Sequence, residues 1–299
     1  MSERACEICG GHAFRPLFAK DGYAFQRCRR CGLERIHPQP GTAALEAIYG
    51  RRYYEAWGAH ADEELSRQLK KATFRRHLAA GSRPAPGAQV LDCGAGLGFF
   101  LEAAAEAGLR PYGAEISDYG AGRIARRFGP ERVFCGPFEA AHFPGLGPGA
   151  FAACFMFDFL EHVRDPENVL RKAHAWLAPG GRLVICTPNT ASLSRRLMGA
   201  SWLHFKPEHL FYFHAANLGS LLRRVGFADV RSYPAHKTMN LEYVRHQMRR
   251  YRHWFWTRLS AATKALPAGL RSAPFAAHFG EMVVVARRGT GPQQFAAGR

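Results

Sequence analysis

The sequence of 299 residues has no apolar run long enough to cross a membrane. A membrane-spanning helix needs about 20 consecutive apolar residues. No signal-peptide pattern follows the opening residues Met1–Arg4. Both absences favour a cytoplasmic protein. Hydrophobic residues make up 47% of the chain, which is enough to form a sizeable core.

Acidic residues are also scarce, because 24 Asp and Glu stand against 41 Lys and Arg, a formal net charge of +17. This excess predicts anionic partners, such as phosphorylated substrates, lipid head groups or nucleic acid. The scarcity is greatest between Tyr243 and Gly280, where no Asp or Glu occurs.

Part of this acid-free region has a helical pattern. Apolar residues recur every three or four positions over 241–266, which predicts one amphipathic helix with an arginine-rich polar side. Such a helix can lie on an anionic membrane surface. It can equally be a lid or a homodimer helix that packs its apolar stripe against protein, and we favour this second interpretation.

The eight cysteines fall into two groups. Four lie within or at the end of apolar segments, where a small buried thiol is expected: Cys93, Cys135, Cys154 and Cys186. The other four form two Cys-x-x-Cys pairs with 18 residues between them: Cys6, Cys9, Cys28 and Cys31. Two such pairs, each followed by a glycine (Gly10 and Gly32), are typical of a structural zinc site with four thiolates. Disulfides are the weaker alternative in a cytosolic chain.

The segment from Val90 to Leu101 predicts a buried strand, a glycine turn and then a helix. A dinucleotide-binding turn has the pattern G-x-G-x-x-G and would need a glycine where Phe99 stands. The pattern here is Asp92-x-Gly94-x-Gly96-x-Gly98. About 20 residues further on, a second strand ends at Glu115, where a carboxylate can bind both ribose hydroxyls of a nucleotide-like ligand.

Further blocks follow in a fixed order: an apolar segment at 132–135, another at 151–157, Leu-Glu-His-Val and Asp-Pro at 160–166, a helix to Leu177, and Pro-Gly-Gly before a strand that ends in Thr-Pro-Asn at 189. The glycine turn resembles motif I of class I S-adenosylmethionine (SAM) methyltransferases. The blocks from 88 to 189 together resemble the ubiquinone-biosynthesis branch of that family.

The resemblance implies an α/β fold, a Rossmann-like seven-stranded sheet in which the last strand, 281–287, runs antiparallel. It also implies SAM as cofactor, bound by residues of the glycine turn and of the following strand ends: Asp92, Gly94, Ala95, Gly96, Gly98, Glu115, Phe138 and Phe157. Pro137 departs from the family pattern, which usually has an acid there that contacts adenine. Backbone groups of Phe138, or Glu139, would have to replace it.

Asp158, Glu161 and His162 are spaced i, i+3 and i+4, which places them on one side of a turn. Related O-methyltransferases have Glu-x-x-Glu-His here, and some hold a divalent ion with it. Asp158 keeps the charge but shortens the reach. Three hypotheses stay open: a divalent ion at these residues, His162 or His209 as a general base, and a structural Glu161–His162 pair.

The chain is predicted to have three parts. Residues 1–37 form a zinc ribbon whose folding depends on the metal, because so few residues cannot bury a core. Residues 38–87 form a linker and a helical cap, including a helix from about Asp62 to Leu78 and an aromatic stripe with Tyr49, Tyr53 and Tyr54. Residues 88–299 form the SAM-binding domain, with substrate-side inserts at 190–213 and 236–279. The first insert carries a Pro-Glu-His-Leu pattern that lies over the active-site mouth in the resembling branch.

The expected function is transfer of a methyl group to an oxygen, or a carbon, of a small metabolite, sugar or lipid-linked intermediate. The net charge favours an anionic or phosphate-bearing acceptor. RNA methylation is the competing hypothesis, supported by the ribbon and the charge, although no Asn-Pro-Pro-Tyr motif follows the fourth strand. A protein that binds SAM without turnover is the third.

Overall fold

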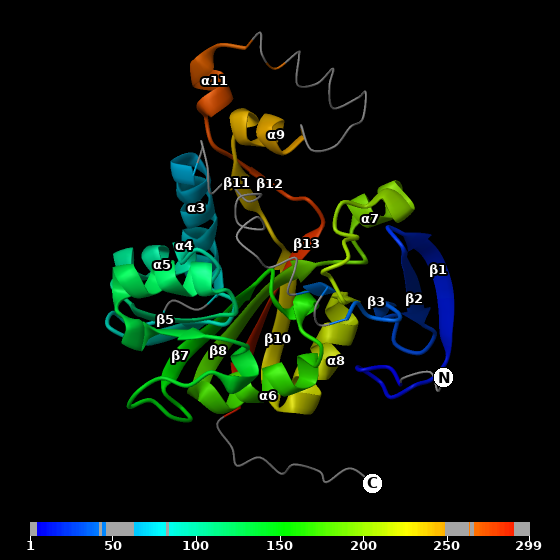
Figure 1. The fold of residues 1–299 in the computed structure, drawn as a ribbon, viewed down its shortest axis with the longest axis horizontal. Coiled ribbons are helices and arrows are strands. Elements are labelled where there is room, and N and C mark those ends of the chain that lie inside the picture. Colours follow the sequence, from blue (N-terminus) through cyan, green and yellow to red (C-terminus); the bar gives the residue numbers. More distant parts are fainter. Residues whose placement is uncertain are drawn as a thin grey trace.

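The computed structural model describes residues 5–41, 44–45, 63–81, 84–248, 263 and 266–289. Its centre is a seven-stranded sheet in the order β10-β13-β8-β7-β4-β5-β6 (Figure 1). The strands β4 to β8 run parallel to one another, and β13 is antiparallel to both β8 and β10. The predicted sheet and the antiparallel last strand are thereby confirmed. The strand bounds are β4 Gln89–Asp92, β5 Arg110–Glu115, β6 Val133–Cys135, β7 Phe151–Phe157, β8 Leu177–Pro188, β10 Phe227–Pro234 and β13 Glu281–Arg288.

Both faces of this sheet are covered by helices, which makes three layers. Successive side chains of a strand point to opposite faces, so Val90 and Leu91 belong to different hydrophobic clusters. The cluster with Val90 includes side chains of α3 (Glu63–Gly81), α4 (Phe99–Glu106) and α5 (Asp118–Phe128). The cluster with Leu91 includes those of α6 (Pro166–Trp176) and α8 (Ala215–Val225). Burial on both faces explains why the parallel strands are continuous apolar runs in the sequence.

Two of these helices have well-defined ends. Asp165 caps α6 by accepting a hydrogen bond from the backbone N–H of Asn168 at 3.0 Å, with Pro166 at the first helical position. At the start of α8, His214 and Asn217 each accept a hydrogen bond from the other's backbone N–H, and the helix ends at Gly226 with a φ of 104°. These caps fix where each helix meets the sheet.

The N-terminal residues 5–37, which we call the ribbon, form three antiparallel strands: β1 Phe14–Lys20, β2 Tyr23–Cys28 and β3 Glu34–Ile36. A fourth strand, β9 (Phe211–Tyr212), comes from the predicted 190–213 insert and pairs antiparallel with β3. Ribbon residues such as Ile8 and Leu33 also belong to the main hydrophobic cluster. The ribbon therefore shares a sheet and a core with the rest of the chain. The spacing of its cysteines in the sequence did not indicate this.

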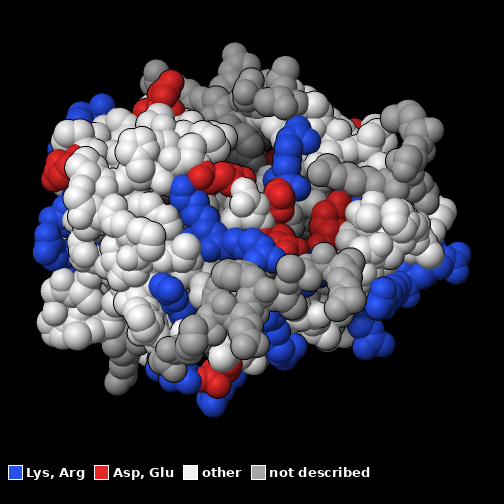
Figure 2. All heavy atoms as spheres, turned by 90° about the horizontal axis from the view of Figure 1, so that it is seen from below, with Lys and Arg blue, Asp and Glu red and all other residues white. Residues whose placement is uncertain are grey.

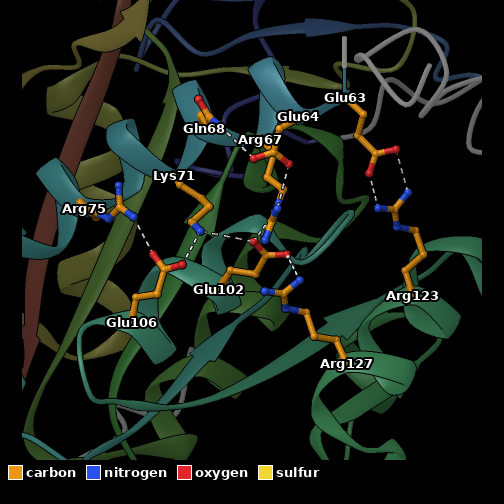
Figure 3. A network of polar contacts seen from close by, with 10 residues as sticks. All are labelled: Glu63, Glu64, Arg67, Gln68, Lys71, Arg75, Glu102, Glu106, Arg123 and Arg127. Atoms are coloured by element: carbon orange, nitrogen blue, oxygen red, sulfur yellow. Dashed lines mark hydrogen bonds and ion pairs between the residues drawn. The ribbon is translucent and has the colours of Figure 1, made fainter. Parts of the chain in front are cut away.

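The helix predicted from about Asp62 to Leu78 is α3, and it packs on α4. Figure 3 shows charged side chains that join α3 to α4 and α5. Glu102 of α4 is 6% exposed and lies 2.6 Å from Arg67 Nε, 3.1 Å from Arg127 Nη1 and 3.6 Å from Lys71 Nζ. The other ion pairs of this network are Glu64–Arg67, Glu106–Lys71, Glu106–Arg75 and Glu63–Arg123.

The predicted 236–279 insert begins with a two-stranded sheet of β11 (Lys237–Met239) and β12 (Phe275–Ala277). Two short helices, α9 (Leu241–Met248) and α11 (Ala268–Ser272), lie between these strands in the sequence. Of the helix predicted for 241–266, the described residues comprise its start, as α9, and the single residues 263 and 266. The rest of it and the tyrosines of the aromatic stripe lie outside them, so those predictions stay open. A further helix, α7 (Leu193–Met198), follows β8.

Two simpler expectations can be compared with the structure. Within its described residues, no helix is long and apolar enough to cross a membrane. Cys93, Cys154 and Cys186 are buried, as expected. The expectation for Cys135 was wrong: its side chain is exposed, because β6 is the edge strand of the sheet.

Candidate active site

The glycine turn follows β4 at the carboxyl edge of the sheet. Gly96 and Gly98 have φ angles of 55° and 80°, a left-handed conformation that side chains rarely adopt. A Cβ added to Gly96 would meet no atom within 4 Å, whereas one added to Gly94 would lie 2.5 Å from Cδ2 of Phe159. The turn therefore leaves open space beside Gly96 and packs closely against Phe159 at Gly94.

Glu115 lies at the end of β5, where the sequence placed a ribose-binding carboxylate. One of its oxygens accepts a hydrogen bond from the backbone N–H of Gly96 at 2.6 Å, and the other from that of Ser117 at 2.9 Å. The side chain is 5% exposed. The structure therefore directs this carboxylate toward the glycine turn.

Asp92, at the end of β4, is the second carboxylate beside the turn and is 3% exposed. Its Oδ1 has no hydrogen-bond partner among the described residues. Burial raises the pKa of Asp92 to about 8, although the backbone N–H of Gly94 acts in the opposite direction. An unpaired buried carboxylate oxygen is costly unless a ligand provides a donor or a positive charge. Together with Glu115 and the space at Gly96, it fits a ligand with ribose hydroxyls and a cationic group, as SAM has.

The remaining predicted cofactor residues differ in where they point. Ala95 is buried and its N–H donates to Ala114 O at 2.9 Å, which ties the turn to β5. Phe138 is buried, and its ring lies edge-on to Phe159 at 5.9 Å, close to the turn. The ring of Phe157 packs against Phe74 and His77 of α3, at 4.8 and 5.6 Å. That ring helps to hold α3 in place.

A second group of residues follows β7, in a 3-10 turn at Leu160–His162. Glu161 is fully buried, and its Oε2 accepts a hydrogen bond from Thr187 Oγ1 at 3.0 Å, while its Oε1 has no partner among the described residues. The rings of His162 and His209 lie edge-on at 4.6 Å. Ligand atoms of Glu161, His162 and His209 lie within 4.8 Å of one another, so these three could hold a metal ion.

Burial makes all three of these groups neutral near pH 7. It raises the pKa of Glu161 to about 8, with a further contribution from the charge of Asp158. It lowers the pKa of His162 to about 4 and that of His209 well below its usual value. A neutral imidazole can accept a proton or bind a metal ion, so the cluster suits either a general base or a divalent ion.

Asp158, which the sequence grouped with Glu161 and His162, forms a different interaction. Its Oδ2 lies 3.3 Å from Lys237 Nζ, and Lys237 also lies 2.6 Å from Oε1 of Glu281. Desolvation raises the pKa of Asp158, but the charges of Lys237 and Lys70 and the hydrogen bond from Lys237 together outweigh it and lower that pKa to about 2. Asp158 has a φ of 49°, an unusual value for a residue other than glycine.

Lys237 and Glu281 did not emerge from the sequence as site residues. Glu281 is 2% exposed, and burial raises its pKa to about 7, against the effect of Lys237. The signal that could have found it is its position, since it is the acid that opens an otherwise apolar last strand. Lys237 could not be found in this way, because its partners lie far away in the sequence, one directly after β7 and the other in β13.

The four paired cysteines lie together, with all four Sγ atoms within 4.8 Å of one another. Sγ of Cys6 lies 3.4 Å from Cys31, and Sγ of Cys9 lies 3.5 Å from Cys28. These distances exclude disulfides, in which the bond is about 2.05 Å. They are close to the roughly 3.8 Å edges of a tetrahedron with zinc–sulfur bonds of about 2.3 Å. The donor set and its shape therefore fit a structural zinc ion.

Comparison with known proteins places this geometry in context. A model of the family described as "Methyltransferase domain" matches residues 61–232. A tRNA U34 carboxymethyltransferase of Syntrophotalea carbinolica is 28% identical over 60% of this chain and 55% of its own length. A ubiquinone biosynthesis O-methyltransferase of Xanthomonas campestris pv. campestris is 31% identical over 40% of this chain and 51% of its own length. The chain thus spans about half the length of these curated relatives.

Solved structures show the same fold at low identity. A SAM-dependent methyltransferase from Thermotoga maritima has a TM-score of 0.51 at 18% identity and covers 82% of this chain and 99% of its own. A phosphoethanolamine N-methyltransferase of Haemonchus contortus in complex with SAM has a TM-score of 0.53 at 16% identity, over 86% of this chain and 62% of its own. Fold and family model agree with the predicted class I methyltransferase sheet. The chain belongs to the methyltransferase-domain family.

Proposed function

We propose that the chain is a SAM-dependent methyltransferase that methylates an oxygen, or a carbon, of a small anionic acceptor. One observation carries the proposal: the neutral cluster of Glu161, His162 and His209 lies at the same edge of the sheet as the glycine turn. Phe159 connects the two, because it packs against Gly94 and directly precedes the turn with Glu161 and His162.

Asp92, the glycine turn and Glu115 would hold SAM, which supplies a methyl group already activated for transfer. The protein then has to align a nucleophile with that methyl group and exclude water. His209 is buried, His162 is partly buried and both are uncharged, so either can accept the proton of an acceptor hydroxyl. A divalent ion at the same three residues would instead lower the pKa of that hydroxyl.

An anionic acceptor is supported by lysines near the same edge. Burial lowers the pKa of Lys70 to about 8 and also lowers that of Lys206. The negative charge of Asp158 acts in the opposite direction and raises both pKa values. On the face drawn in Figure 2, basic side chains alternate with acidic ones around a hollow. The lining of a cavity of about 560 Å³ includes Lys20, Asp21, Lys206 and Glu208, the last of which directly precedes His209 in the chain.

RNA is the second candidate acceptor, favoured by the tRNA-modifying relative and the net charge of +17. Both hypotheses can be tested with SAM labelled in its methyl group, incubated with small phenols, sugar nucleotides and bulk tRNA in separate reactions. We expect label in a small acceptor, together with an equal amount of S-adenosylhomocysteine.

The same assay tests the cluster. His209→Ala should lower the rate by roughly 100-fold, the usual contribution of a general base. The matched control is His142→Ala, because His142 is exposed and contacts the carbonyl of Ala140 and the ring of Phe134, outside the cluster. If label appears in tRNA alone, the acceptor is RNA and the hypothesis of a small acceptor is wrong. An unchanged rate for both His209→Ala and His162→Ala would remove the cluster from the mechanism.

A further inference from the structure

His209 belongs to a segment, residues 202–213, that lies between the ribbon and the turn with Glu161. The peptide groups of Leu210 contact both sides. The N–H of Leu210 donates to the carbonyl of Glu161 at 2.8 Å, and the carbonyl of Leu210 accepts from the N–H of Ile36 in the ribbon at 3.1 Å. A single residue next to His209 thus connects the ribbon to the proposed catalytic cluster.

The pairing continues beyond Leu210. Phe211 and Tyr212 form β9, which pairs with Arg35 and Glu34 of β3. At the end of the segment, the N–H of Thr190 donates to the carbonyl of Phe213 at 2.9 Å, which connects it to the residues after β8. Residues 210–213 are therefore hydrogen-bonded to the ribbon and to the loop after β8.

Aromatic packing holds the other half of the segment. A hydrophobic cluster joins Phe25 and Ile36 of the ribbon to Trp202, Phe205 and Tyr212 of the segment, all buried. The ring centroids of Phe25 and Phe205 are 5.1 Å apart, and those of Phe205 and Tyr212 are 4.9 Å apart. Buried aromatic pairs of this kind add stability beyond the area that they cover. Without the ribbon, these rings would lose one wall of their cluster.

Polar contacts tie the ribbon to the helices on both sides of the segment. Arg195 Nη2 lies 3.3 Å from Glu34 Oε2, and Glu34 is 2% exposed. On the α8 side, His214 Nε2 donates to the carbonyl of Cys31, one of the four paired cysteines, at 3.2 Å. The cysteine site is therefore in direct contact with the cap of α8 and, through β3, with β9.

We propose that the ribbon is a positioning element for methyl transfer: by pairing with residues 210–212 it holds His209 against Glu161 and His162. This inference rests on the proposed function for the role of His209. It assigns the four cysteines to the acceptor side of the active site and leaves the SAM side independent of them. Loss of the metal that the cysteines would bind should then loosen the 202–213 segment before the glycine turn.

Hydrogen–deuterium exchange of the full chain, read by mass spectrometry, tests this order. We compare the wild-type protein with the Cys6→Ser, Cys31→Ser double variant, and use Cys135→Ser, an exposed cysteine outside the ribbon, as the matched control. The double variant should speed exchange in peptides covering 202–213 by about tenfold or more, because loss of about one net hydrogen bond has an effect of this size. Peptides covering 89–116 should be unchanged, and calorimetry should give the same SAM affinity.

A milder variant keeps the test valid if the double variant fails to fold. Glu34→Gln removes the charge facing Arg195 and leaves the cysteines intact. It should speed exchange in 202–213 and lower kcat for methyl transfer, while the dissociation constant of SAM stays within about twofold of wild type. Restoring the charge with Glu34→Asp should recover part of both effects. Unchanged exchange at 202–213 in these variants would overturn the inference, as would an equal increase at 89–116. Absence of methyl transfer to any acceptor would refute the proposed function instead, and the exchange result would still stand.

Discussion

Glu102 of α4 accepts a hydrogen bond from Arg67 Nε of α3 at 2.6 Å, within a contact that buries the carboxylate to 6% exposure. Lys71 and Arg127 approach the same carboxylate (Figure 3). Since α4 begins directly after the glycine turn, this contact attaches α3 next to the proposed SAM site.

Removing that carboxylate should destabilise the fold. Glu102→Ala removes the most buried carboxylate of the network and leaves Arg67 and Lys71 with only their more exposed partners, Glu64 and Glu106, so we expect a loss of roughly 1–3 kcal/mol in the free energy of unfolding. Glu64→Ala is the matched control, because Glu64 also pairs with Arg67 but is 64% exposed, and an exposed ion pair contributes little to stability. Urea unfolding of both variants makes the comparison. Equal losses would show that Glu102 has no special role.

Asp92 predicts a pH dependence of stability. Its pKa is raised to about 8 by burial, so the folded protein keeps a proton that the unfolded chain releases near pH 4. The folded state is therefore favoured at low pH, and this contribution is lost as the pH rises from about 4 through 8. Asp92→Asn should remove part of that decline, by on the order of 1–3 kcal/mol between pH 5 and 8. Parallel pH profiles of unfolding for the two proteins would contradict the buried, unpaired state of Asp92.

Lys237 is the cation between Asp158 and Glu281. The stability lost when it is replaced should therefore depend on pH. At pH 8.5 Lys237→Met leaves a buried Glu281 carboxylate without its partner, which should cost roughly 3 kcal/mol of stability. At pH 5.5 the cost should be smaller, because Glu281 has a pKa of about 7 and is then protonated, which leaves only the partly exposed Asp158 without its partner. Urea unfolding at the two pH values tests this. A loss of the same size at both would mean that packing of the lysine stem, rather than charge, is what matters.

The cysteine site predicts a metal content. Purified protein should carry one zinc ion per chain, measured by elemental analysis, and the Cys6→Ser, Cys31→Ser variant should carry none because a four-thiolate site loses half its ligands. Cys135→Ser should retain the zinc. Metal-free wild-type protein, or a disulfide between Cys6 and Cys31 under reducing conditions, would be inconsistent with this site.

Sequence patterns predicted the central sheet because its signals are local. A run of apolar residues that ends in Asp92 and a glycine turn, or in Glu115, indicates strand and site together. The same applies to Glu161 and His162, which are neighbours in the chain. His209 was named from the family pattern alone, and its contact with His162 depends on how residues 202–213 fold.

The less predictable features depend on long-range pairing. Nothing in residues 34–36 indicates that their partner strand lies at 211–212, because both segments are too short to show a period. Lys237 and Glu281 lie too far apart in the sequence for any local pattern to link them. Asp158 was grouped by spacing with Glu161, but its left-handed backbone turns its side chain toward Lys237.

The central claim is that Asp92, the glycine turn and Glu115 bind SAM, and calorimetric titration tests it most directly. Wild-type protein should bind one SAM per chain. Gly96→Val fills the open space beside the turn, and Glu115→Ala removes charge-assisted hydrogen bonds that contribute roughly 1.5–3 kcal/mol each, so both should weaken binding by about tenfold or more. Glu131→Ala, at an exposed acid away from the turn, should bind as wild type does. Absence of SAM binding by the wild-type protein, or unchanged affinity in both site variants, would contradict the account.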